Sequence, residues 1–200
     1  EFGMVYTREE LAALYATCQK YGLRLFIDGA RLGYGLVSAA CDYDLPFLAK
    51  HCDVFYIGGT KVGAMMGEAV VFSGMKAPKY FFTNVKRHGA LLAKGRMLGI
   101  QFDTLFTDEL YFKISRHAIA MATRIRSIFE KHGIAIAYDS PTNQQFVVLS
   151  PALYEALSQK VAFEIWERKS EHEIICRFVT SWATKEEELD ELDRILQAYA

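Results

Sequence analysis

The chain has 200 residues, a formal net charge of −1 at pH 7 and 52% hydrophobic residues, which is enough apolar material for a packed core. The balanced charge and the absence of a long Lys/Arg run argue against nucleic acid as a partner. The sequence contains no run of about 18 apolar residues and no signal-peptide pattern, so we expect neither a membrane span nor secretion.

The four cysteines, Cys18, Cys41, Cys52 and Cys176, form no Cys-x-x-Cys pair and no metal-like spacing with the histidines. This pattern predicts reduced thiols, a cytoplasmic protein and no bound metal. Near the start of the chain, Thr7-Arg-Glu-Glu10 has the pattern of a capping box and predicts a helix that extends to Lys20.

Two short apolar runs follow, and each ends in a charged residue set among glycines. Leu23–Ile27 and Val54–Ile57 are rich in Phe, Ile and Val, which predicts buried parallel strands. Asp44–His51, between them, predicts a short helix with an aspartate as its N-cap. A strand–helix–strand crossover places its strands parallel and close together, so Asp28 and Lys61 are expected at the same carboxyl edge, where open α/β sheets bind ligands.

Lys61 lies among Gly58, Gly59 and Gly63, which let the backbone turn tightly and approach a ligand closely. One interpretation of Asp28 and Lys61 is a simple ion pair, as for most charged residues. The functional interpretation is that a partly desolvated Lys61 amine forms a Schiff base with a carbonyl group. Asp28 would then hold the protonated ring nitrogen that makes pyridoxal phosphate an electron sink.

Phe26-Ile-Asp-Gly-Ala-Arg31 followed by Gly59-Thr-Lys61 resembles the threonine aldolase and β-eliminating lyase group of pyridoxal-phosphate enzymes, which have the aspartate aminotransferase (type I) fold. The resemblance reaches the C-terminus through Arg177-Phe-Val-Thr-Ser-Trp-Ala-Thr184, which is similar to the late arginine strand of the family. It implies that Lys61 carries the cofactor, that Asp28 pairs with the pyridine nitrogen, and that Arg31, beside the cofactor, helps to hold the substrate carboxylate.

The resemblance also implies an α/β fold. Residues 1–106 would form the C-terminal part of the cofactor-binding large domain with its sheet, and residues 107–200 a linking helix and a small α+β domain. The predicted sheet has two parallel strands and one antiparallel strand, which is too few for a stable sheet covered on both faces. We therefore expect a substantial N-terminal part of the large domain to lie outside this sequence. In the family, that part carries the loop that grips the cofactor phosphate.

After Lys61, Glu68–Phe72 predicts a strand antiparallel to the one before it, because the link between them is short. Helices are predicted over Lys79–Arg87 and Ala90–Phe106. Lys86 and Arg96 lie on these segments, and the ordinary interpretation is a solvated helix face. The family resemblance offers the alternative that they bind the cofactor phosphate, near a dimer interface.

The residues from 107 onward predict a long helix and a small α+β domain. Thr107–His132 has the longest helical pattern, with Gly133 as its C-cap and Tyr111 in its buried stripe, and His117 on it is interpreted as a packing or surface residue. The remaining elements are strands at Ile134–Tyr138, Gln145–Leu149, Phe163–Glu167 and Ile174–Val179, and helices at Pro151–Val161 and Lys185–Tyr199, the latter after a capping box at Thr184-Lys-Glu-Glu187.

Arg177 lies in an otherwise apolar strand, and a buried arginine needs an anionic partner. That partner is either an internal Glu or Asp or, as the resemblance favours, the α-carboxylate of a substrate. Thr142, Asn143 and Gln144 precede a strand and are interpreted as a turn.

The leading hypothesis is an amino-acid lyase that uses pyridoxal 5′-phosphate to cleave threonine or allo-threonine into glycine and an aldehyde. The substrate amine displaces Lys61, Arg31 and Arg177 orient the substrate carboxylate, and Asp28 keeps the ring nitrogen protonated. β-Elimination or transamination on the same scaffold is the alternative within enzymes. An inactive fragment that serves as a dimerisation module is the alternative outside them. The resemblance implies a homodimer or homotetramer with the site near a subunit interface.

Overall fold

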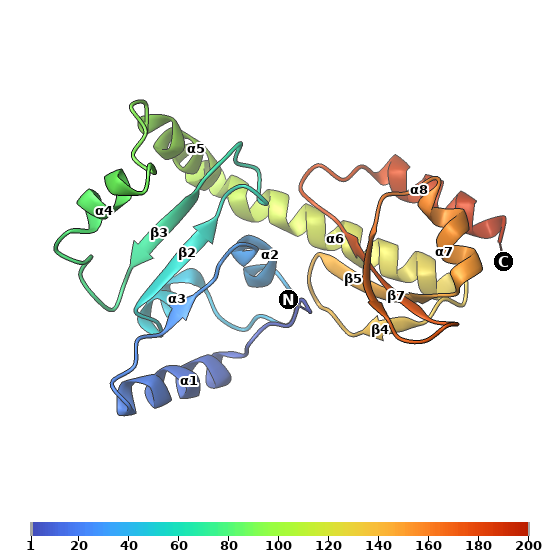
Figure 1. Cartoon of the computed structure of the whole chain (residues 1–200), viewed down its shortest axis with the longest axis horizontal. Coiled ribbons are helices and arrows are strands. Elements are labelled where there is room, and N and C mark those ends of the chain that lie inside the picture. The colour runs from blue at the N-terminus through green and yellow to red at the C-terminus, as the bar shows by residue number, and fades with distance from the viewer. Residues whose placement is uncertain (1, 200) are drawn as a thin grey trace. The chain divides into compact units, whose positions relative to one another are not determined.

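The computed structural model describes residues 2–199 of the chain, and it divides them into two compact units (Figure 1). The N-terminal unit comprises residues 6–36 and 41–114, and the C-terminal unit comprises residues 115–199 with two short segments, 2–5 and 37–40. The long helix α6 (Leu110–Lys131) begins in the N-terminal unit and continues in the C-terminal unit. The domain boundary expected after residue 106 stays a prediction.

The N-terminal unit contains a three-stranded sheet with the order β1-β2-β3. β1 pairs with β2 in parallel and β2 pairs with β3 antiparallel, as the crossover and the short link predicted. The elements of this unit before α6 are α1 (Arg8–Lys20), β1 (Phe26–Ile27), α2 (Leu32–Leu36), α3 (Leu45–Lys50), β2 (Val54–Gly58), β3 (Glu68–Phe72), α4 (Phe81–Arg87), α5 (Arg96–Phe106) and the short 3-10 helix η1 (Thr107–Glu109).

Local caps define two of these helices as the sequence predicted. The Thr7 hydroxyl accepts from the Glu10 N–H at 3.2 Å, and the Glu10 carboxylate accepts from the Thr7 N–H at 2.8 Å, so the predicted capping box at the start of α1 is confirmed. Asp44 caps α3 by accepting from the Phe47 N–H at 2.9 Å.

The prediction of a buried strand over Leu23–Ile27 is wrong in length and in burial. β1 contains only Phe26 and Ile27, and the side chains of Leu23 and Phe26 are 58% and 57% exposed. The strand is short because, among residues 2–199, β1 pairs only with β2 and only through Phe26 and Ile27. Phe26 is exposed because its side chain projects from a face of the sheet that no described segment covers.

The two faces of this sheet differ in burial, since side chains alternate along each strand. Phe55 and Ile57 of β2 lie on the covered face and are buried. Tyr56 lies on the opposite face, which also carries the half-exposed Phe26 and Val70. We call this second face the open face of the N-terminal sheet.

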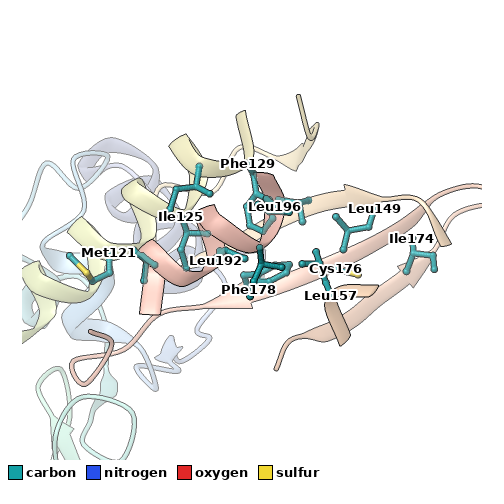
Figure 2. Packing of buried hydrophobic residues seen from close by; sticks show 14 residues of the cluster. Met121, Ile125, Phe129, Leu149, Leu157, Ile174, Cys176, Phe178, Leu192 and Leu196 are labelled. Carbon is teal, nitrogen blue, oxygen red and sulfur yellow. The ribbon is translucent and has the colours of Figure 1, made fainter. Parts of the chain in front are cut away.

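The C-terminal unit is an α+β assembly around a four-stranded antiparallel sheet of order β4-β5-β7-β6. Its core packs α6 and α8 against the sheet through Ile125, Phe129, Phe178 and Leu192 (Figure 2). The Nε2 atom of His117 lies 2.7 Å from the Thr184 carbonyl oxygen, a hydrogen-bonding contact within the C-terminal unit. The elements after α6 are β4 (Ile136–Tyr138), β5 (Gln144–Leu149), α7 (Pro151–Ser158), β6 (Glu164–Arg168), β7 (Ile174–Val179) and α8 (Glu186–Gln197).

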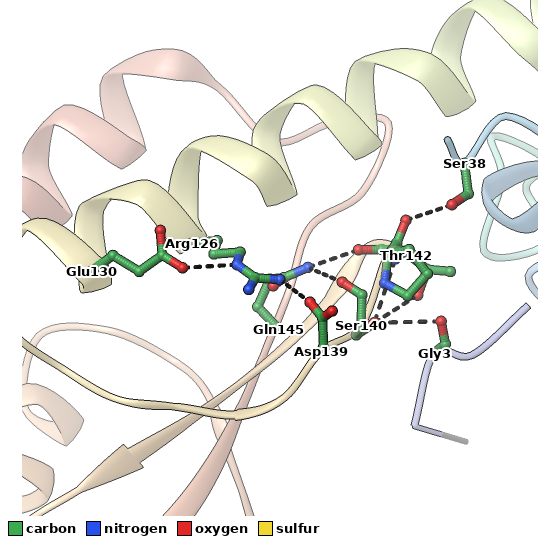
Figure 3. A network of polar contacts seen from close by, with 9 residues as sticks. Gly3, Ser38, Arg126, Glu130, Asp139, Ser140, Thr142 and Gln145 are labelled. Atoms are coloured by element: carbon green, nitrogen blue, oxygen red, sulfur yellow. Dashed lines mark hydrogen bonds and ion pairs between the residues drawn. The ribbon is translucent and has the colours of Figure 1, made fainter. Parts of the chain in front are cut away.

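The segment between β4 and β5 is fixed by polar contacts within the C-terminal unit (Figure 3). The Gln145 amide donates to the carbonyls of Ser140 at 3.2 Å and Thr142 at 2.9 Å, and Ser38 donates to the Pro141 carbonyl at 2.8 Å. Thr142 and Gln145 are buried, and these contacts satisfy the Gln145 amide nitrogen, whereas its Oε1 has no hydrogen-bond partner among residues 2–199. Of the three residues interpreted as a turn, Thr142 and Asn143 lie in this buried segment, whereas Gln144 is the first residue of β5.

Among residues 2–199, no helix is long and apolar enough to cross a membrane. The same residues include no cluster of three or more His, Cys, Asp or Glu side chains that could hold a metal ion.

Candidate active site

The first part of the site is the Asp28-Gly-Ala-Arg31 loop, which leaves the carboxyl end of β1 and leads into α2. Asp28 Oδ1 accepts hydrogen bonds from the Ala30 N–H at 3.0 Å and from the Tyr56 hydroxyl. The hydrogen bond from Tyr56, which has the larger effect, and the bond from Ala30 hold the pKa of Asp28 below its usual value. Asp28 is therefore a carboxylate at neutral pH.

Two glycines allow this loop to lie directly against the end of β2. The Gly58 N–H donates to the Gly29 carbonyl at 2.9 Å. A Cβ at Gly29 would lie 1.7 Å from the Tyr56 carbonyl oxygen, and a Cβ at Gly58 would lie 2.3 Å from the Ala30 carbonyl oxygen. Only glycine fits at either position, so these residues bring the Asp28 loop and the Lys61 turn together.

The second part of the site is the turn that carries Lys61, immediately after β2. The Gly59 carbonyl accepts from the N–H groups of Val62 and Ala64, both at 2.9 Å, and the Gly59 N–H donates to Glu68 Oε2 at 2.6 Å. The Tyr34 hydroxyl, on α2, donates to the Lys61 carbonyl. The backbone of Lys61 is thus held from the helix that follows Asp28.

Asp28 and Lys61 follow adjacent parallel strands at the same edge, which is the placement expected from the crossover. The charges of Lys61 and Arg31 both lie near enough to lower the pKa of Asp28. The expected partial desolvation of Lys61 is wrong, because its side chain is exposed. The reason is that Lys61 lies in the turn beyond the strand, where no residue of 2–199 covers it.

Tyr111 is a site-supporting residue whose role the sequence did not reveal. It is 1% exposed, and its hydroxyl donates to the Gly58 carbonyl at 2.9 Å and accepts from the Gly33 N–H at 3.1 Å. Burial raises the pKa of Tyr111, so the hydroxyl keeps the proton that it donates. The helical pattern predicted that Tyr111 is buried, but no local signal showed that its hydroxyl links two segments more than fifty residues away.

The two candidate phosphate ligands lie on separate helices. Lys86 lies in the last turn of α4, Arg96 is the first residue of α5, and both are exposed. Within residues 2–199, no hydrogen bond or ion pair joins either residue to Asp28 or Lys61. Their assignment to the cofactor phosphate stays a prediction.

Arg177, in the C-terminal unit, has partners on its own sheet. Its guanidinium donates to Glu164 of β6 through Nε at 3.1 Å and through Nη2, and to the Gln144 side chain at 2.9 Å. It also lies over the Trp166 ring, 5.1 Å from the ring centre. The internal acidic partner, one of the two alternatives that the sequence left open, is therefore present, and the substrate role of Arg177 stays a prediction.

The parallel strands with their charged loops at the carboxyl edge, and the small α+β unit that follows, have the architecture of a pyridoxal-phosphate enzyme of fold type I. A solved structure of threonine aldolase from Leishmania major has a TM-score of 0.96 and 37% identity, and the match covers 100% of this chain and 58% of that one. Serine palmitoyltransferase from Sphingomonas wittichii, at 14% identity and a TM-score of 0.65 over 94% of this chain and 50% of that one, shares the fold.

The family model described as beta-eliminating lyase matches residues 1–152, so the chain belongs to the β-eliminating lyase family. A low specificity L-threonine aldolase from a Pseudomonas species is 30% identical over 199 residues, which are 99% of this chain and 57% of that protein. The chain thus spans little more than half the length of the curated relatives it matches. The predicted family and the predicted α/β fold are confirmed.

The cofactor that this family and fold imply is pyridoxal 5′-phosphate, and the residues present fit it. Asp28 accepts both of its hydrogen bonds on Oδ1, and no residue of 2–199 donates to Oδ2. A carboxylate with one oxygen available suits a protonated ring nitrogen, and the exposed Lys61 amine suits the cofactor aldehyde. Asp28 and Lys61 therefore match two groups of the pyridoxal ring, its protonated nitrogen and its aldehyde.

Proposed function

We propose that this chain is part of a pyridoxal-phosphate-dependent aldolase that cleaves a β-hydroxy-α-amino acid, threonine or allo-threonine, into glycine and an aldehyde. The observation that carries the proposal is the placement of Asp28 and Lys61 at one carboxyl edge, in a chain whose relatives include threonine aldolases. In such a site, bound pyridoxal phosphate supplies an electron sink for a bond at Cα of the amino acid.

The roles that we propose for this chain's residues follow from their chemistry. Lys61 holds the cofactor covalently and yields its place to the substrate amine. Asp28, ionised at neutral pH, pairs with the ring nitrogen and keeps it protonated. Arg31 and Arg177 bind the substrate carboxylate, a task that suits the planar guanidinium. Lys86 and Arg96 bind the cofactor phosphate.

We further propose a homodimer or homotetramer in the cytoplasm, with small amino acids as its ligands. Support for an oligomer comes from the exposed apolar side chains of Phe82, Met97 and Ile100, which are 67%, 56% and 52% exposed on α4 and α5. Support for a reducing compartment comes from the cysteines, all four of which are free thiols. Sedimentation analysis of the purified protein tests the oligomer.

Product analysis of the purified protein with pyridoxal phosphate and L-threonine or L-allo-threonine tests the activity. We expect equal amounts of glycine and acetaldehyde, and none from Lys61→Ala. Lys50→Ala, which alters an exposed lysine in the last turn of α3, is the matched control and should keep full activity. Ammonia and a keto acid would instead identify a β-eliminating lyase, and no product from the native protein would identify a non-catalytic module.

A further inference from the structure

Asp28 is held asymmetrically. Its Oδ1 accepts from the Tyr56 hydroxyl and from the Ala30 N–H, while no residue of 2–199 donates to its Oδ2. A carboxylate has about four acceptor positions, so two donors on one oxygen fix the rotation of the group and leave the other oxygen available. The side chain of Asp28 is exposed, so that oxygen is accessible to a ligand.

The alternation of β2 explains why Tyr56 can reach Asp28. Phe26 pairs with Val54 and Ile27 with Phe55, so the next position along the two strands places Tyr56 across from Asp28 on the open face. The rings of Phe26 and Tyr56 lie with their centres 6.1 Å apart. Two neighbouring strands therefore position the phenol, which makes it a more rigid partner than a loop side chain would be.

The charges around Tyr56 and Asp28 keep Tyr56 as the donor and Asp28 as the acceptor of their hydrogen bond. Burial and the bond to Asp28 raise the pKa of Tyr56 to about 12, and the nearby carboxylate of Glu68 acts in the same direction. The Tyr56 hydroxyl is thus protonated and donates at neutral pH. Lys61 and Arg31 are the cations that face Asp28, and they favour its ionised form.

We propose that Tyr56 is a positioning residue for Asp28: its hydroxyl holds Oδ1, so that the carboxylate stays ionised and offers Oδ2 to the protonated ring nitrogen of the cofactor. This inference rests on the proposed function, because it assigns the ring nitrogen as the partner of Asp28. The Tyr56–Asp28 bond itself is a property of the protein without cofactor, and it can be tested separately.

The first experiment is a carbon NMR titration of the Asp28 carboxyl group in the cofactor-free protein. In Tyr56→Phe, the pKa of Asp28 should rise, because the strongest donor to its ionised form is gone. Tyr21→Phe removes a hydroxyl from a side chain that is 67% exposed at the end of α1, and it should leave Asp28 unchanged. An Asp28 pKa that is the same in Tyr56→Phe and the native protein would overturn the proposal.

A second measurement needs no variant and remains available if Tyr56→Phe does not fold. In the native protein, the NMR signal of the phenol carbon of Tyr56 should shift with the same midpoint as the Asp28 carboxyl group, because protonation of Asp28 alters the bond that the hydroxyl donates. A Tyr56 signal that does not respond to the Asp28 titration would refute the bond.

The third experiment uses the cofactor-loaded protein. The nitrogen NMR signal of ring-labelled pyridoxal phosphate should report a less protonated ring in Tyr56→Phe than in Tyr21→Phe, and kcat should fall by about tenfold with KM little changed. An unchanged ring signal and an unchanged kcat in Tyr56→Phe would overturn the positioning role. If the native protein does not bind the cofactor, the proposed function fails, whereas the two titrations still decide whether Tyr56 controls Asp28.

Discussion

At the residue scale, single hydroxyl groups join segments of the N-terminal unit that lie far apart in the sequence. Tyr111 is the best example, since its hydroxyl satisfies both the Gly58 carbonyl and the Gly33 N–H in a buried position. These groups lie at the end of β2, which precedes the Lys61 turn, and in α2, whose Tyr34 hydroxyl donates to the Lys61 carbonyl. A buried group that loses its partner costs more than the hydrogen bond itself contributes.

We therefore predict that Tyr111→Phe lowers the free energy of unfolding by about 1–3 kcal/mol, because the carbonyl and the N–H stay buried without this partner. Urea unfolding followed by circular dichroism measures the change. Tyr21→Phe, whose side chain is 67% exposed, should change the same quantity by less than about 0.5 kcal/mol. Equal effects of the two substitutions would contradict the linking role of the Tyr111 hydroxyl.

A second prediction at this scale concerns Glu164, which accepts hydrogen bonds from the Arg177 guanidinium. We assign that guanidinium to the substrate carboxylate. The Glu164 side chain is 64% exposed and that of Arg177 is 18% exposed, so the pair is easily opened from the side of Glu164. Glu164 offsets the positive charge of Arg177, so it weakens the attraction of this guanidinium for an amino-acid carboxylate. We predict that Glu164→Gln lowers KM by about two- to fivefold, the range for an exposed ion pair, with little change in kcat.

Steady-state kinetics with threonine measures this effect. Glu167→Gln, on the same strand, changes a carboxylate that contacts Tyr138 and not Arg177, and it should leave KM unchanged. A KM that is equal in Glu164→Gln and Glu167→Gln would contradict competition between Glu164 and the substrate carboxylate for Arg177.

At the element scale, the end of α6 follows from one glycine. Gly133 has a φ of +71°, its N–H donates to the Glu130 carbonyl at 3.0 Å, and the Ile134 N–H donates to the Phe129 carbonyl at 2.9 Å. This is the Schellman arrangement, in which a residue with positive φ ends the helix. A Cβ at Gly133 would meet no atom within 4 Å, so a substitution here tests backbone conformation alone.

We predict that Gly133→Ala destabilises the protein by about 1–2 kcal/mol, the cost of the left-handed conformation for a residue with a side chain. Gly99→Ala is the matched control, because Gly99 lies within α5, has no positive φ and also has open space around its Cβ. It should stabilise the protein by about 0.5–1 kcal/mol. Urea midpoints that move in the same direction for both variants would refute this account.

The C-terminal end of α6 is joined to α8 by a cluster of charged side chains. Asp193 Oδ2 accepts from the Lys131 ammonium at 2.7 Å, and Asp193 Oδ1 lies 2.6 Å from His132 Nε2. The hydrogen bond from Lys131, which has the larger effect, and the contact with His132 hold the pKa of Asp193 below its usual value. Because the folded-state pKa is depressed, this stabilisation is fully present above the unfolded-state pKa of the carboxyl group. It is lost as the pH falls through the folded-state value.

Asp193→Asn should therefore unfold more easily than the native protein at neutral pH, and the difference should disappear in acid. Unfolding free energies measured from pH 7 downward test this expectation, with Glu171→Gln, in the exposed turn between β6 and β7, as the control. A difference that persists unchanged in acid would mean that the charge of Asp193 is not responsible.

The two capping boxes were predicted from the same four-residue pattern, and only one of them is present. The capping box at Thr7 is confirmed, but the one at Thr184 is wrong: Lys185 is the N-cap of α8, and its N–H donates to Glu188 at 3.1 Å. The Thr184 hydroxyl instead accepts from the Ser181 N–H at 2.9 Å. A local pattern cannot show which of two competing donors the hydroxyl takes.

At the scale of the whole molecule, the sequence predicted most strands, and it predicted the relative directions of β1, β2 and β3, because apolar runs and short links depend on neighbouring residues only. The antiparallel order of the C-terminal sheet was not predicted. The sequence also placed Asp28 and Lys61 at one edge, since a parallel crossover leaves no other arrangement. The exposure of β1 and Lys61 and the hydroxyl contacts of Tyr34 and Tyr111 could not be predicted. They depend on which distant segments pack together, and periodicity carries no signal for that.

The central claim of this account is that Lys61 is the amine that carries the cofactor, and reductive trapping tests it most directly. The cofactor-loaded protein is treated with borohydride and digested, and the peptides are analysed by mass spectrometry. We predict a single phosphopyridoxyl group on Lys61, absent from Lys61→Arg. Labelling spread over exposed lysines such as Lys50 and Lys86, or undiminished in Lys61→Arg, would contradict the claim.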